Sequence, residues 1–144
     1  MTAEQMPLLE EEFIAIDEIA QGVDLVAAVR ELNDSGVKKP WAWVLASNWE
    51  ELGEGEIRSS MMFGVNNDRG ILAWRQGWEA SVPTIGVGTE WTTVYLGGMY
   101  DSSAQPGSDV PIEIVYQAVE EYLATRERPT CVEWRRGEIA PRRR

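Results

Sequence analysis

Residues 108–134 read SDVPIEIVYQAVEEYLATRERPTCVEW, and this stretch decides the fold class. Ser108 and Asp109 are residue types that cap the start of a helix, and Pro111 and Glu113 suit its first turn. Apolar residues then recur at helical spacing, which predicts an amphipathic helix with one broad apolar stripe. The stripe consists of Ile112, Val115, Tyr116, Val119, Tyr122 and Leu123.

This helix is expected to end before Pro129, because proline cannot continue a helix, and residues 130–134 predict a closing strand. A second helix is predicted upstream, where Asp24 is a suitable N-cap and residues 33–36, Asn-Asp-Ser-Gly, end the apolar pattern. Its apolar face consists of Leu25, Val26, Val29 and Leu32.

Short apolar segments between and before the helices predict further strands. Residues 41–46 are apolar throughout, so this strand is expected to be covered on both faces. Residues 66–70, Asn-Asn-Asp-Arg-Gly, are typical of a hairpin turn. The other predicted strands are residues 13–16, 57–65, 71–75, 78–82 and 91–96. The order β-α-β-β-β-β-β-α-β indicates an α+β domain, with two helices packed on one face of a mostly antiparallel sheet.

A length of 144 residues suits a single domain. We expect this domain to cover residues 1–136 and residues 137–144, which contain Arg142, Arg143 and Arg144, to form a disordered basic tail. The longest apolar run has six residues, and the first residues do not resemble a signal peptide. The sequence therefore predicts a soluble cytoplasmic protein without membrane contact.

The composition excludes several kinds of catalytic and metal site. The chain has no histidine, which removes histidine triads and histidine metal ligands, and its one cysteine excludes an internal disulfide and a thiolate zinc site. We expect Cys131 to be an inert thiol packed in the closing strand. The carboxylates at Glu50, Glu51, Glu54 and Glu56 are expected to form a solvated loop. We therefore predict no enzyme activity, no metal and no cofactor.

Tryptophan is the unusual component of the sequence. Alternation along a strand places Trp41 and Trp43 on one face, and Trp91 and Tyr95 on one face of a later strand. Exposed tryptophans are typical anchors of protein interfaces. The seven tryptophans are Trp41, Trp43, Trp49, Trp74, Trp78, Trp91 and Trp134.

The same alternation turns Val94 and Leu96 away from Tyr95, and we expect these two residues to face the helix-covered core. The net charge of −11, from 24 acidic and 13 basic residues, argues against direct nucleic-acid binding. Such a charge instead attracts basic proteins. The sequence thus indicates a basic macromolecular partner.

Four motifs together resemble a known protein family. They are residues 70–74 (GILAW), residues 95–98 (YLGG), residues 110–113 (VPIE) and residues 121–134 (EYLATRERPTCVEW). They are similar to the first-numbered family of immunity proteins in bacterial polymorphic toxin systems, and the likeness covers roughly residues 12–135. In that family a small α+β protein is encoded beside a toxin, often a nucleic-acid deaminase. The resemblance implies a non-catalytic antitoxin that binds its cognate toxin and occludes the active site.

The expected partner contacts combine the acidic loop with the aromatic strands and the end of the closing motif. One alternative is a closed pocket, lined by Trp74, Trp91 and Tyr95, that binds a small cationic ligand; another is a hydrolase that uses paired glutamates. The predicted contact residues are Trp41, Trp43, Trp49, Glu50, Glu51, Glu54, Glu56, Trp91, Tyr95, Tyr100, Asp101, Glu133 and Trp134.

Overall fold

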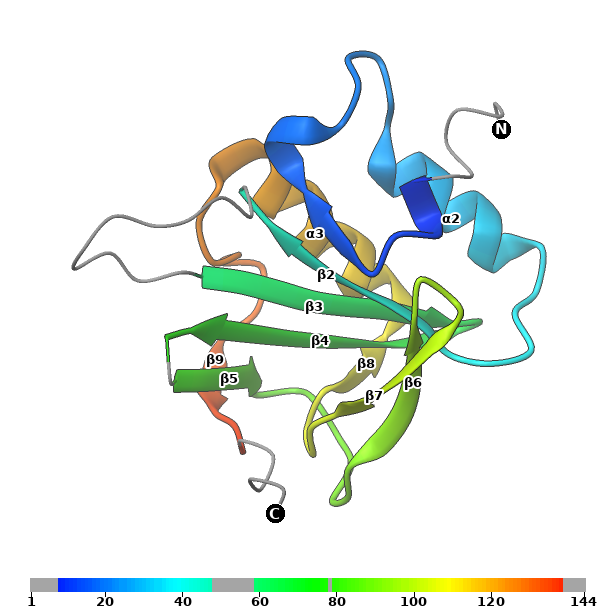
Figure 1. The fold of residues 1–144 in the computed structure, drawn as a ribbon. Helices are drawn as coiled ribbons and strands as arrows, with labels where there is room; N and C mark the ends of the chain where they lie inside the picture. The colour runs from blue at the N-terminus through cyan, green and yellow to red at the C-terminus, as the bar shows by residue number, and fades with distance from the viewer. Residues whose placement is uncertain (1–7, 48–58, 78, 139–144) are drawn as a thin grey trace.

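Three strands form the middle of the sheet in the computed structural model, which describes residues 8–47, 59–77 and 79–138. They are β2 (Trp41–Ala46), β3 (Ser59–Asn66) and β4 (Arg69–Gln76), and both neighbouring pairs are antiparallel. The β3–β4 hairpin turns at Asn67, whose φ of 67° lies in the left-handed region. Figure 1 shows these strands side by side across the molecule.

Each outer edge of this central unit is shared by two shorter strands. Along β2, β6 (Thr92–Leu96) pairs in parallel with its first residues and β1 (Phe13–Ala15) pairs in parallel with its last. Along β4, β8 (Asp109–Pro111) and β5 (Glu79–Pro83) divide the edge in the same way, both antiparallel. The sheet ends at β7 (Tyr100–Ala104), beside β6, and at β9 (Trp134–Arg136), beside β5.

Both helices of the described residues cover one face of β2–β4. They are α2 (Leu25–Asp34) and α3 (Ile112–Thr125), and a short 3₁₀ turn, η1 (Ile16–Glu18), follows β1. The core between helices and sheet contains the apolar side of α3 and the alternate side chains of β2, β3 and β4. Its central members are Leu25, Val29, Trp43, Leu45, Met61, Phe63, Leu72, Trp74, Val115, Tyr116, Val119 and Tyr122. The predicted α+β class, with both helices on one face, is confirmed.

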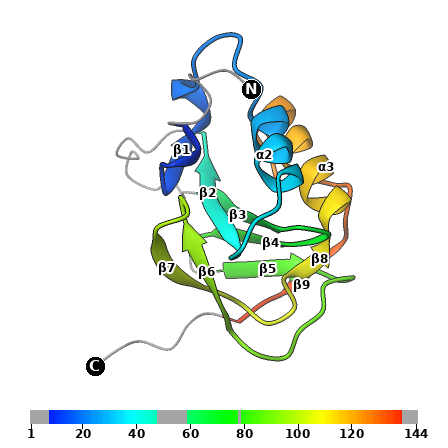
Figure 2. The same cartoon turned by 90° about the vertical axis from the view of Figure 1, so that its right-hand side faces the viewer.

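A second, smaller apolar cluster lies on the helix-free face. Val94 and Leu96 of β6 and Ala104 of β7 pack there against Ala42 and Ile71. Figure 2 shows why: the β6–β7 hairpin bends toward the side of the sheet opposite the helices. The prediction that Val94 and Leu96 face the helix-covered core is therefore wrong. Because Leu96 pairs in register with Ala42, it shares the face of Ala42 and not that of Trp43.

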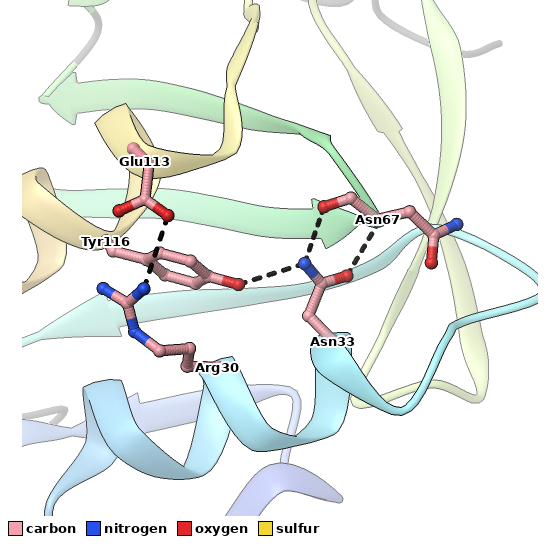
Figure 3. A network of polar contacts seen from close by, with 5 residues as sticks. All are labelled: Arg30, Asn33, Asn67, Glu113 and Tyr116. Carbon is pink, nitrogen blue, oxygen red and sulfur yellow. Dashed lines mark hydrogen bonds and ion pairs between the residues drawn. The ribbon is translucent and has the colours of Figure 1, made fainter.

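A buried polar network joins α2, α3 and the β3–β4 turn (Figure 3). The Asn33 side-chain amide donates to the Asn67 carbonyl at 2.7 Å and to the Tyr116 hydroxyl at 3.0 Å. Its oxygen accepts the backbone N–H of Asn67 at 2.8 Å. On the same side, Arg30 lies over the Tyr116 ring and forms an ion pair with Glu113. These contacts fix how the helices meet the sheet.

Several predicted boundaries need correction. Asp24 caps α2 as predicted, since its carboxylate accepts the Ala27 N–H. The predicted cap at Ser108 and Asp109 is wrong, because Asp109 belongs to β8 and binds Arg69, and α3 begins only after Pro111. The closing strand is also displaced: it is β9, not residues 130–134. Strands β7 and β8 were not predicted.

Three predicted features reach beyond the described residues. Ile57, which begins a predicted strand, and Trp78 lie outside them, and of the predicted tail only Gly137 and Glu138 are described. The Gly137 N–H donates to the Ala80 carbonyl at 2.8 Å. No helix within residues 8–47, 59–77 and 79–138 is long and apolar enough to cross a lipid bilayer.

Candidate partner-binding surface

The sheet register brings three of the predicted contact residues together. Tyr95 of β6 pairs with Trp41 of β2 on one side and with Asp101 of β7 on the other. Residues paired across neighbouring strands project to the same side, so all three contribute to one surface. Asp101 is exposed, Trp41 and Tyr95 are partly exposed, and the Lys39 ammonium lies 5.0 Å from the centre of the Tyr95 ring.

The turn between β6 and β7 extends this surface. Gly97 and Gly98 both have positive φ, of 61° and 80°, and the N–H groups of Gly98 and Met99 bond back to the carbonyls of β6. The tight turn pushes the next two side chains outward: Met99 is 68 % exposed and Tyr100 is 53 % exposed. Met99 lies beside Trp41, and neighbouring exposed apolar groups of this kind are typical of an interaction site.

A hollow of about 260 Å³ lies beside the turn. Trp41 forms one wall, and a Cβ atom added to Gly98 would lie 2.5 Å from its ring, so the indole rests directly on the turn. The segment before β1 closes another side and is held by the Trp43 indole N–H, which donates to the Leu9 carbonyl at 2.9 Å. The residues that line the hollow are Leu9, Glu10, Trp41, Gly97, Gly98 and Met99.

Carboxylates surround these apolar groups. Glu10, Glu11 and Asp101 are exposed, and among the described residues none of their carboxylates forms an ion pair or a hydrogen bond. We name the combined region the hairpin surface. It consists of Glu10, Glu11, Trp41, Tyr95, Met99 and Asp101. The exposed Tyr100 pairs with Leu96 and therefore projects to the opposite side of the β6–β7 hairpin.

Glu133 and Trp134 lie at the opposite edge of the sheet, beyond β5. The Trp134 indole N–H donates to the Pro129 carbonyl at 2.7 Å, and the Arg128 guanidinium lies 5.8 Å from the centre of its ring. Arg128 and Trp134 also line a shallow hollow with the two arginines of β9. The structure therefore separates this pair from the hairpin surface and gives its surroundings a positive charge.

Within the motif of residues 121–134, the Glu121 side chain holds the segment that follows α3. The Glu121 carboxylate accepts hydrogen bonds from the Thr130 N–H at 2.7 Å, the Thr130 hydroxyl at 2.8 Å and the Cys131 N–H at 3.1 Å. These bonds, the backbone bond from Thr130 first, lower the pKa of Glu121. The segment between α3 and β9 is thereby tied back onto the helix.

Cys131 differs from the prediction of a packed strand residue. It lies in this segment before β9, and its side chain is exposed. Local desolvation, and then the nearby Glu121 carboxylate, raise the pKa of its thiol. A raised pKa disfavours the thiolate, which supports the predicted inertness of Cys131, whereas the predicted packing in a strand is wrong.

The prediction that Trp43 contacts a partner is also wrong. Trp43 is completely buried, with its ring stacked on Phe63 at 5.2 Å between centres, so it offers no surface to a partner. Alternation placed it correctly beside Trp41, but this face lies under the helices. Trp91 is partly exposed just before β6. The remaining predicted contacts, Trp49, Glu50, Glu51, Glu54 and Glu56, lie outside the described residues.

The predicted aromatic pocket does not form. Trp74 lies in the helix-covered core with its ring edge-on to Tyr122, at 5.3 Å between centres. Across the sheet, Tyr95 pairs with Trp41, Trp41 with Val65, and Val65 with Gly70 of β4. Tyr95 is therefore three strands away from β4, and its register partner Gly70 lies four residues before Trp74. Within the described part of the chain, no three acidic or thiol side chains are placed to hold a metal ion.

Sequence reasoning missed Met99, Glu10 and Glu11 as members of the surface. The Gly97-Gly98 pair is the signal that indicates a tight turn with an exposed neighbour. Nothing local indicates Glu10, because it reaches the surface only through the contact of its carbonyl with Gly97.

Comparison with known proteins agrees with the motifs. The sequence model described as Immunity protein Imm1 matches residues 15–136, which is most of the chain. No curated protein is similar enough in sequence to count as a match. The chain therefore belongs to the Imm1 family of immunity proteins.

Proposed function

We propose that this protein is an antitoxin that binds a cognate polymorphic toxin and neutralises it by occluding the toxin's active site. The observation that carries the proposal is the match of the Imm1 family to residues 15–136. The hairpin surface supports it, because exposed aromatic and methionine side chains are the residue types that anchor protein interfaces.

We assign the toxin to the nucleic-acid deaminases and expect its contact face to be basic. The family resemblance favours deaminase partners, and the net charge of −11 favours a cationic one. An enzyme that acts on nucleic acid needs cationic groups along its substrate path, because they bind the phosphate backbone. An acidic protein can occupy that path in place of the substrate.

The protein itself acts by binding and not by catalysis. It has no histidine, the raised pKa of Cys131 disfavours a nucleophilic thiolate, and the Glu121 carboxylate is already engaged by three hydrogen bonds. We place it in the bacterial cytoplasm, where it binds the toxin protein and neither nucleic acid nor membrane directly.

Co-expression with the toxin domain encoded at the same locus tests this function. Cells with both proteins should survive, the two should co-purify, and deaminated bases should not accumulate in the nucleic acid. A toxin with its catalytic residue replaced serves as the control for toxicity. Death of the co-expressing cells, or separate elution of the two proteins, would refute the antitoxin function. Protection from a toxin with another activity would refute only the deaminase assignment.

A further inference from the structure

We infer that the cognate toxin docks on the hairpin surface and inserts one lysine or arginine side chain into the hollow beside Trp41. This inference rests on the proposed function and adds the site and the chemistry of the contact. The hollow lies on a described surface formed by β2, β6, β7 and the segment before β1.

The size of the hollow suits a single side chain. Sites for drug-sized ligands occupy about 300–1,000 Å³, and this hollow, at about 260 Å³, is smaller. An anchor residue that fills a small pocket near the centre of an interface is the usual arrangement of a binding hot spot.

The lining selects a long cationic side chain. Trp41, Leu9 and Met99 give the hollow apolar walls. Glu10 also lines it, with its backbone carbonyl against Gly97, and this exposed residue has no cationic partner among the described residues. Lysine and arginine bury an apolar stem and keep a charged head at the polar end. A cation near a tryptophan face is attracted to the ring as well. A neutral apolar side chain would form no charge interaction with Glu10.

The walls are already fixed in the free protein. Gly97 and Gly98 hold left-handed conformations, Trp41 rests on Gly98, and the carbonyl of Glu10 would lie 2.6 Å from a Cβ at Gly97. Since little needs to be ordered on binding, more of the contact energy is retained as affinity.

Charge distinguishes this surface from the opposite edge. Glu10, Glu11 and Asp101 have no cationic partner among the described residues. Arg128, Arg135 and Arg136 instead surround Trp134. A basic toxin face is therefore attracted more strongly to the hairpin surface than to the Trp134 edge, where Glu79 and Glu133 offset only part of the positive charge.

The first test introduces a positive charge at the mouth of the hollow. Met99→Arg should raise the Kd for an immobilised, catalytically inactive toxin domain about tenfold or more, as expected for a central contact. The matched control is Val87→Arg. Val87 is 55 % exposed and lies before β6, at the end of that strand opposite Met99. Because both side chains are exposed, both variants should keep the thermal stability of the parent, and Val87→Arg should change the Kd no more than about twofold.

The second test concerns charge alone. Glu10→Gln combined with Asp101→Asn should slow association several-fold at about 0.01 M salt and much less at about 1 M salt, because salt screens the attraction. Glu79→Gln combined with Glu133→Gln removes the same charge near the arginines and should slow association much less.

The outcomes separate the two proposals. If the parent protein does not bind the inactive toxin, the proposed function fails and this inference fails with it. If the parent binds and Met99→Arg binds equally well, or if the control variants lose as much as the test variants, only the docking site is overturned.

Discussion

At the scale of single residues, Gly98 must be glycine for two separate reasons. Its φ of 80° is strained for any residue with a side chain, and a Cβ there would meet the Trp41 ring at 2.5 Å. The first reason is shared by several turn glycines of the chain, whereas the second concerns the wall of the proposed docking hollow. Alanine substitutions at two glycines can distinguish the conformational cost from the steric cost.

Gly22 supplies the matched comparison for Gly98→Ala. Its φ is 89°, and no atom lies within 4 Å of a Cβ built there. Gly22→Ala should therefore lose only the conformational cost, about 1–2 kcal/mol. Gly98→Ala should lose a further ~1–3 kcal/mol, because the indole must move. Urea unfolding gives both losses, and equal losses would show that Trp41 does not press on the turn.

At the scale of elements, the helices and central strands could be predicted because their signals are local. Asp24 and the apolar spacing indicate α2, a continuous apolar run indicates β2, and the turn residues 66–70 separate β3 from β4. The start of α3 could not be predicted, because the Asp109 carboxylate does not cap the helix. It instead accepts a hydrogen bond from Arg69, which lies forty positions away along the chain. Strand β7 has no apolar alternation, and its pairing with β6 alone makes it a strand.

The candidate site shows the same division between local and distant information. Trp41, Tyr95 and Asp101 could be proposed from residue type and strand alternation. Trp43 obeys the same alternation but lies under the helices, and local sequence does not reveal which sheet face the helices cover. Glu10 joins the surface only because a segment distant in sequence packs on the β6–β7 turn.

The segment between α3 and β9 depends on one carboxylate, which makes its stability depend on pH. The pKa of Glu121 is lowered in the folded protein. The resulting stabilisation is present above the unfolded value of about 4.5 and is lost as the pH falls through the folded value. Thermal unfolding at a series of acidic pH values should show this loss in the parent and less of it in Glu121→Gln.

Glu120→Gln is the control, because Glu120 is exposed at the neighbouring position of α3. Its unfolding temperature should follow the parent at every pH. In Glu121→Gln the neutral amide no longer offers two carboxylate oxygens to Thr130 and Cys131, so its stability at neutral pH should be lower than the parent's. Identical pH profiles for parent and Glu121→Gln would contradict the role assigned to this carboxylate.

At the scale of the whole molecule, the sheet separates two different surfaces. One edge carries the hairpin surface with its carboxylates, and the other carries Trp134 and its arginines. The helices α2 and α3 lie on one side of β2–β4, and neither contributes a residue to the lining of the proposed hollow. A substitution at the exposed Met99, which is not part of the helix-covered core, can therefore change binding without disturbing the contact between helices and sheet.

That contact depends on two tyrosines of α3. Burial raises the pKa of Tyr116 and of Tyr122 above the ordinary value of 10.0, against the opposing effect of hydrogen bonds with Asn33 and Ser59. A raised folded pKa means that the stabilisation is complete below pH 10.0 and is lost as the pH rises beyond it. Ionisation would place negative charge inside the core of a protein that already carries a net charge of −11.

Tyr122→Phe tests this dependence, because phenylalanine keeps the ring beside Trp74 and removes the ionising hydroxyl. Below pH 10 the variant should be about 1 kcal/mol less stable than the parent, since the hydrogen bond with Ser59 is lost. Above pH 10 the stability of the variant should fall less steeply than that of the parent. The free energies of unfolding of the two proteins, measured with urea, should therefore converge as the pH rises. Tyr100→Phe, at an exposed position, should follow the parent throughout. Parallel curves for Tyr122→Phe and the parent would show that ionisation of Tyr122 does not limit the alkaline stability.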